Sequence, residues 1–227
     1  MKSLKSVFRR LAFSAVLLFL TVPCFADAND TFAELVSDTN LTLHVADSLD
    51  TWVLHSSYTG NGTVVAATDM LKDTAGNAGL FYTSQDPATA EYDIQMDVTG
   101  TSDVMGPAGR VQASPVNTAY YILWNNGAGE WRLFKRAAGT TTTLATYTGD
   151  DPNGATITVK LEIRDAAKKA YFGGTERMSS TDNAITGAGR AGLKLSGVTS
   201  DRGDNWSYTN AGAAAVVHSL TLIGVGK

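Results

Sequence analysis

The sequence predicts an all-β fold, an antiparallel sandwich of two sheets, and two features of the chain carry this prediction. Apolar and polar residues alternate in short runs, as they do in strands that bury one face. Gly, Asn, Asp and Thr separate these runs, which is typical of turns. Because no segment with helical periodicity links the runs, crossover helices are not expected and neighbouring strands should pair antiparallel.

Two runs show the alternation most clearly. In 90–98 and in 156–164 every second residue is apolar, beginning at Tyr92 and at Ile157. The residues between them are charged or polar. Each run is therefore expected to be a strand that buries its apolar side and exposes the other.

The aromatic runs 120–124 and 131–136 are expected to form a hairpin. The connection between them, Asn125 to Gly129, is rich in Asn and Gly, which tolerate the positive φ values of tight turns. We expect the last strand of the chain to pair with the first. The further strands are expected at 31–35, 63–67, 79–83, 108–113, 144–147, 170–172, 191–196 and 216–224.

The first 26 residues have the pattern of a secretory signal. Basic residues up to Arg10 precede an apolar run from Leu11 to Val22, and small residues follow near Ala26. A membrane span needs about 20 apolar residues, and this run is shorter. We therefore expect residues 1–26 to be a signal peptide and residues 27–227 to be one domain without a membrane span. The mature chain should be secreted, periplasmic or at the cell surface.

The charge of the mature chain narrows the choice of partner. Cleavage after Ala26 leaves 14 basic against 22 acidic residues, a formal charge of −8. Such a chain, without a basic run, is a poor partner for nucleic acid or an anionic membrane surface. The only cysteine, Cys24, lies in the predicted signal, so disulfides and cysteine-ligated zinc are not expected in the mature domain.

A series of short motifs points to one group of secreted sandwiches. They are Asp30-Thr31-Phe32, Gly109-Arg110, 120–123, 131–135, Tyr171-Phe172-Gly173-Gly174 and Gly189 to Leu193. In this order they resemble the concanavalin A-like lectin/glucanase superfamily, in its laminin G-like branch of secreted bacterial modules. The resemblance implies a jelly-roll sandwich over 27–227 that holds a polysaccharide or glycan on its concave sheet. Residues 199–215 depart from the pattern, and we expect a rim loop or a surface elaboration there.

The residues around the predicted hairpin are the candidates for this sugar-binding role. A sugar needs an aromatic platform for its apolar face and fixed hydrogen-bonding groups for its hydroxyls. Trp124 or Trp131 is the expected platform. The expected hydrogen-bonding groups are Arg110, Tyr121, Asn125 and Asn126. The alternative is that Tyr121 and one tryptophan belong to the core, and that Arg110 pairs with an acidic neighbour.

No complete catalytic pattern accompanies the motifs, so a non-catalytic, lectin-like module is expected and we name no catalytic residue. Glycosidases of the superfamily carry an E-x-D-x-(x)-E strand with two catalytic carboxylates. Glu91, Asp93 and Asp97 only echo it, because the last residue is Asp and its spacing differs. A structural or adhesive subunit that self-associates is the alternative, and a polysaccharide hydrolase or lyase is the third hypothesis.

Calcium is the ion that such a secreted sandwich is expected to bind, through Asp, Asn and backbone oxygens in its loops. The densest candidate cluster is Asp201, Asp204 and Asn205, and the second is Asp150, Asp151 and Asn153. A solvated turn is the alternative explanation of either cluster.

Overall fold

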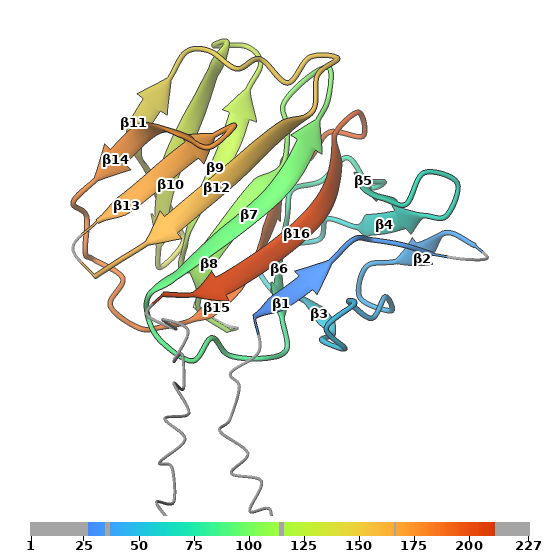
Figure 1. Ribbon diagram of the computed structural model, residues 1–227, viewed down its shortest axis with the longest axis horizontal. Helices are drawn as coiled ribbons and strands as arrows, with labels where there is room; N and C mark the ends of the chain where they lie inside the picture. Colours follow the sequence, from blue (N-terminus) through green and yellow to red (C-terminus); the bar gives the residue numbers. More distant parts are fainter. Residues whose placement is uncertain (1–26, 35–36, 114–115, 166, 212–227) are drawn as a thin grey trace, which may run out of the picture.

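The computed structural model describes residues 27–34, 37–113, 116–165 and 167–211. These residues form two sheets of antiparallel strands that lie face to face (Figure 1), which confirms the all-β sandwich. No helix occurs among them, so none of the described segments is a membrane-spanning helix. The predicted signal, 1–26, and the predicted last strand, 216–224, lie outside the described residues.

One sheet has nine strands, and β7 and β16 lie side by side at its centre (Figure 1). In spatial order it contains β14 (Thr175–Ser180), β13 (Lys168–Phe172), β12 (Ile157–Ile163), β7 (Tyr92–Thr99), β16 (Arg202–Asn210), β5 (Met70–Asp73), β4 (Gly62–Val65) and β2 (Thr39–Asn40), with β1 (Ala28–Asp30) paired to β16. The predicted strands at 90–98 and 156–164 are therefore confirmed, and they are neighbours.

The other sheet has seven strands and contains the predicted hairpin. In spatial order it contains β11 (Thr140–Tyr147), β10 (Glu130–Ala137), β9 (Ala119–Asn125), β8 (Gly106–Val111), β15 (Arg190–Leu195), β6 (Gly79–Thr83) and β3 (Trp52–Leu54). β9 and β10 pair antiparallel with Trp124 opposite Trp131, which confirms the hairpin.

The inner faces of the two sheets enclose one apolar core, as the alternation predicts. Every second side chain of β7 from Tyr92 to Val98 is fully buried, and so are Val159, Leu161 and Ile163 of β12. Fully burying a large apolar side chain contributes about 1.5–3 kcal/mol. Since residues 27–227 contain no cysteine, this core rather than a disulfide holds the sheets together.

Two glycines of the predicted motif at 189–193 are required by close backbone approach. A Cβ on Gly192 would lie 2.0 Å from the carbonyl oxygen of Phe81 on the adjacent strand β6. Gly189 has a φ of +55°, and a Cβ there would lie 2.5 Å from the carbonyl carbon of Arg110. Neither position accommodates a side chain without a backbone shift, so these glycines fix how β15 enters the sheet.

Two expectations about the chain ends are wrong. The first strand is Ala28–Asp30 rather than 31–35. The segment 199–215 is not simply a loop, because 202–210 form β16, which pairs with both β7 and β1. Its sequence reads as polar because only Trp206 and Tyr208 point into the core, and both are buried.

Candidate functional site

The two tryptophans expected to form a stacking platform lie in the core instead. Trp131 is fully buried and Trp124 is 4% exposed, and their ring centroids are 5.5 Å apart. Trp131 also packs against Phe172 of the opposite sheet, at 4.9 Å between centroids. The expectation fails for a geometric reason, because alternation along β9 and β10 directs both indoles between the sheets.

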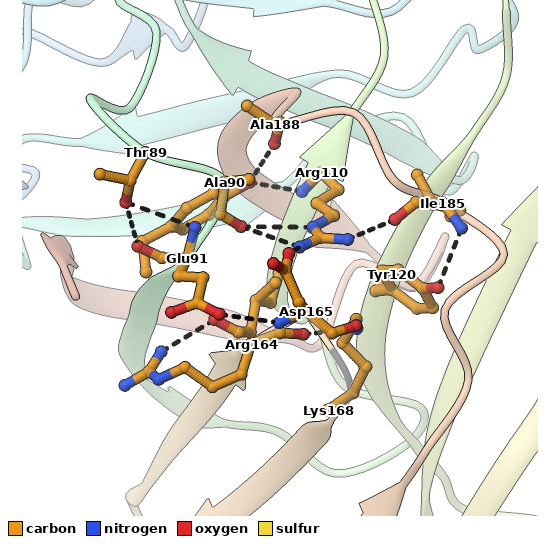
Figure 2. A network of polar contacts seen from close by, with 12 residues as sticks. Thr89, Ala90, Glu91, Arg110, Tyr120, Arg164, Asp165, Lys168, Ile185 and Ala188 are labelled. Atoms are coloured by element: carbon orange, nitrogen blue, oxygen red, sulfur yellow. Dashed lines mark hydrogen bonds and ion pairs between the residues drawn. The ribbon is translucent and has the colours of Figure 1, made fainter. Parts of the chain in front are cut away.

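Arg110 is buried as well, and its contacts are structural (Figure 2). The guanidinium donates to the carbonyls of Ala90, at 3.1 and 3.3 Å, and Ile185, and it pairs with Asp165 at 3.0 Å. Its backbone N–H donates to the Tyr92 hydroxyl at 2.6 Å. We call these contacts the Arg110 clamp. They tie β8 to three other segments, which leaves the side chain unavailable for a sugar.

A second buried cation, Lys168, lies beside the clamp (Figure 2). Its ammonium donates to the carbonyls of Arg164 at 2.7 Å and Asp165 at 3.3 Å, and lies 5.0 Å from the ring centroid of Tyr120. Burial, and then the charge of Arg110, lower the pKa of Lys168 to about 8. The Lys168 side chain shares the inner face of β13 with Ala170 and Phe172, so this ammonium is enclosed between the sheets and we assign it to the structure rather than to binding.

The two predicted asparagines shape the turn of the hairpin. Asn125 Oδ1 accepts a hydrogen bond from the N–H of Ala128 at 2.8 Å. The N–H of Asn126 donates to Asp103 Oδ1 at 2.8 Å. Asn126 is exposed at one end of the sheet, whereas Asn125 is engaged in the turn.

The three residues predicted to bind calcium do not converge. Asp201 is fully buried and accepts a hydrogen bond from Ser196 Oγ at 2.7 Å. Asn205 is exposed and donates from Nδ2 to Asp97 at 2.9 Å, with Asp204 accepting its N–H at 2.7 Å. Across the described parts of the chain, no group of three or more His, Cys, Asp or Glu side chains is placed to hold a metal ion.

The carboxylates of the 91–97 run make structural contacts on the outer face of the nine-stranded sheet. Asp93 pairs with Arg164 at 2.8 Å and with Lys160 at 3.3 Å. Asp97 accepts hydrogen bonds from the Thr158 hydroxyl and from Asn205. Each carboxylate is thus neutralised or hydrogen-bonded by a neighbouring strand, which accounts for its presence without catalysis.

A second apolar cluster lies on the outer face of the seven-stranded sheet. We call it the outer cluster, and it consists of Leu80, Tyr82, Ala108, Val111, Ala119 and Tyr121, with Val53, Tyr58, Leu123 and Phe134 partly buried against it. Tyr121 and Phe134 face each other across β9 and β10, with centroids 5.2 Å apart. Among the described residues no second sheet covers this face, but the six members of the cluster are only 0–5% exposed, because segments such as the one that carries Tyr58 pack against them.

Cationic side chains border the outer cluster. They are Arg132 and Arg136 on β10 and Arg190 and Lys194 on β15. Arg190 lies over the Tyr82 ring, at 5.5 Å from its centroid, and pairs with Asp86 at 2.7 Å. Of the rings in the outer cluster, Tyr82 and Tyr121 are buried, whereas Phe134 is partly exposed. The exposed part of the face therefore combines an aromatic ring with donors of hydrogen bonds, the two components that sugar recognition requires.

A cavity of about 290 Å³ opens at the Arg190 end of this face. Its lining consists of Asp86, Val111, Gln112, Ala113, Ala188, Gly189 and Arg190. Small-molecule sites are typically about 300–1,000 Å³, so the cavity is slightly smaller than the lower limit of that range. The guanidinium of Arg190, the amide of Gln112 and the carboxylate of Asp86 supply it with both donors and acceptors.

The outer cluster could not be predicted from the sequence, because both faces of the hairpin are apolar. β9 carries large apolar side chains on each side, so its alternation does not say which side faces the core. The clearer signal is in β10, where Arg132, Phe134 and Arg136 share one face. Two cations around one ring mark that face as the outer one.

Comparison with solved structures shows the fold, whereas no family model and no curated protein matches the sequence. The carbohydrate binding module CBM66 from Bacillus subtilis aligns with a TM-score of 0.54 and 13% identity, covering 78% of this chain and 98% of that one. The β-glucanase of Bacillus licheniformis aligns at 0.52 and 10%, covering 77% and 98%. The calcium-bound exoplasmic/lumenal domain of VIP36 aligns at 0.54 and 9%, covering 76% and 88%. The described strands thus form a concanavalin A-like jelly roll.

Proposed function

We propose that this concanavalin A-like domain is a secreted, non-catalytic carbohydrate-binding module, and that its glycan lies on the outer face of the seven-stranded sheet. The observation that carries the proposal is the outer cluster itself. Its ring from Phe134 is partly exposed between Arg132 and Arg136, whereas the tryptophans are buried. That a neighbour in structure is named a carbohydrate binding module supports the class of ligand.

The contacts expected with a sugar follow from the layout of this face. The apolar face of a pyranose would pack on Phe134 and Leu123, both partly exposed beside the more buried Tyr121. Hydroxyl groups would bond to the guanidinium groups of Arg132 and Arg190 and to the polar lining of the cavity. No covalent step is involved, and the binding energy comes from stacking and hydrogen bonds alone.

A glycan array probed with the purified protein tests this proposal. Selective binding to one class of glycan, without release of reducing ends from the bound polysaccharide, is the expected result. Reducing ends released in step with time would instead favour the hydrolase hypothesis. The same array is run with calcium and with a chelator. Loss of signal in the chelator would show that glycan binding requires a cation.

A second candidate function, self-association as a structural or adhesive subunit, is favoured by one surface feature. Leu43 and Leu49 are 77% and 82% exposed, and Val45 between them is 52% exposed. A contiguous apolar patch marks a contact surface, and these three exposed side chains of one short segment are the candidates for such a patch. Light scattering at several concentrations separates the two functions, since a carbohydrate-binding monomer keeps its particle size on dilution.

A further inference from the structure

Two cations meet at one tyrosine ring on the outer face of the seven-stranded sheet. Tyr58 comes from the segment that follows β3 and packs against the outer cluster. The Nζ of Lys194 lies 4.7 Å from its ring centroid, and the Cζ of Arg136 lies 5.8 Å from it. Lys194 is only 4% exposed, so two like charges are held close together in a largely desolvated place.

These cations differ from the others on this face in their partners. Arg132 pairs with Glu130 at 2.7 Å, and Arg190 pairs likewise with an acidic side chain. Among the described residues, Arg136 bonds only to the hydroxyl of Thr141, at 2.8 Å, and Lys194 only to the carbonyl of Leu195, at 2.7 Å. In the described parts of the chain no carboxylate therefore lies within ion-pair distance of either cation, although Asp73 and Asp201 act on Lys194 from further away.

Polar atoms around the same ring lack hydrogen-bond partners in the described parts of the chain. They are Arg136 Nε, the Tyr58 hydroxyl and Asn117 Oδ1, and all three are buried. Burial raises the pKa of Tyr58, whereas the charge of Arg136 and a hydrogen bond with the Asn117 side chain lower it. That hydrogen bond has poor geometry, so Tyr58 and Asn117 are only weakly paired with each other. Buried polar atoms are rarely left without a hydrogen bond, because an unpaired one costs free energy. A ligand that forms a hydrogen bond with such an atom therefore binds more tightly.

The electrostatics of Lys194 point the same way. Burial, and then the charge of Arg136, lower the pKa of Lys194 to about 7. Asp73 and Asp201 act in the opposite direction, from beyond ion-pair distance. An anion placed beside both cations would stabilise the protonated ammonium that burial disfavours.

Resting on the proposed function, we propose that Arg136, Lys194 and Tyr58 form a subsite for an acidic group of the glycan. The ligand is then a polysaccharide with anionic substituents, either uronate carboxylates or sulfate esters. The guanidinium fork of Arg136 suits either group, because both present paired oxygens. The sign of the charge here is opposite to that of the chain as a whole, which is −8 over residues 27–227.

Two pairs of polysaccharides test the subsite and tell its two possible ligands apart. Polygalacturonate is compared with its fully methyl-esterified form, and dextran sulfate with dextran, by affinity electrophoresis of the purified protein. The protein is expected to bind the charged member of one pair at least about tenfold more tightly. Equal affinity for both members of both pairs would overturn the proposal.

Variants assign that preference to the subsite. Arg136→Gln and Lys194→Met should each remove most of it, whereas Arg177→Gln, which removes the same charge from β14 of the other sheet, should preserve it. Thermal unfolding verifies that each variant folds, and Arg136→Gln carries the test alone if the buried Lys194 tolerates no change. A preference that survives Arg136→Gln in a folded protein contradicts the subsite.

Failure of this inference is distinguishable from failure of the proposed function. Binding to neutral glycans on the array without any preference for charged ones leaves the proposed function intact and removes the subsite. Absence of binding to every glycan, charged or neutral, removes both.

Discussion

Arg110 and Arg136 lie on the same seven-stranded sheet but differ in how their guanidinium groups are bonded. Arg110 is fully buried, and its side chain donates to two carbonyls and a carboxylate from separate segments (Figure 2). Arg136 reaches the outer face, bonds to one hydroxyl and keeps a buried Nε without a described partner. A cation whose donors are used within the protein stabilises the fold, whereas one with an unpaired donor is suited to a ligand.

The same contrast separates the two sets of aromatic side chains. Trp124 and Trp131 contribute to the core between the sheets, whereas Phe134 is a partly exposed ring at the edge of the outer cluster. The sequence favours the larger rings for stacking, because the size of a side chain and its neighbouring turn residues are visible in the chain. The direction in which each ring points is visible only in the sheet.

The largest effect is expected from truncating a core indole. Trp124→Ala should lower the free energy of unfolding by about 3–5 kcal/mol, because it leaves a cavity next to Trp131. Urea unfolding measures this loss. The fraction of Trp124→Ala that stays folded should bind glycan as the wild type does. If this variant instead kept its stability and lost binding, Trp124 would be the stacking platform that the sequence predicts.

A somewhat smaller loss is expected from the Arg110 clamp. Arg110→Met should lower the free energy of unfolding by roughly 3 kcal/mol, because the buried carbonyls of Ala90 and Ile185 lose their donors. Arg110→Lys keeps the charge but not the fork, and it should recover only part of the loss. Full recovery by lysine would show that charge, rather than hydrogen-bond geometry, is what the clamp supplies.

The smallest effect is expected from the buried hydrogen bonds around Asp30. His44 bonds to Asp30 at 2.9 Å and to Glu34 at 2.7 Å. Burial lowers the pKa of His44, but the two carboxylates outweigh it and raise the pKa above 6.5. The stabilisation is therefore complete below the unfolded value near 6.5 and is lost as the pH rises through the raised folded pKa.

His44→Gln tests this pH dependence. Over that window the wild type should lose unfolding free energy as the pH rises, as measured by urea unfolding at a series of pH values. The variant should show a flatter profile. Parallel profiles for the two proteins would mean that His44 stays neutral in the folded state.

Much of the fold could be predicted from the sequence, for a reason visible in β7 and β12. Each has one apolar side and one polar side, so period-two alternation identifies both the strand and its buried face. β14 and β16 were missed because their side chains are mostly polar. Such strands are held by backbone pairing with a neighbour, as β16 is with β7, and pairing leaves no pattern in one sequence.

The candidate site was harder to predict because it depends on contacts between distant segments. Tyr58, Arg136 and Lys194 meet although they are far apart in the chain. Of the residues predicted to bind a ligand, Tyr121 belongs to the outer cluster, whereas Arg110 and the two indoles are structural. Composition identified the chemistry that a sugar requires but not the face that provides it.

The most direct test of a glycan on the outer face is one pair of matched variants on the same array. Phe134→Ala removes a partly exposed ring from the outer cluster, and Tyr171→Ala removes one from β13 of the opposite sheet. Loss of a stacking ring should weaken binding by roughly tenfold in Phe134→Ala. Tyr171→Ala should bind like the wild type. The reverse result, with Tyr171→Ala impaired and Phe134→Ala unaffected, would place the glycan on the nine-stranded sheet and contradict the account.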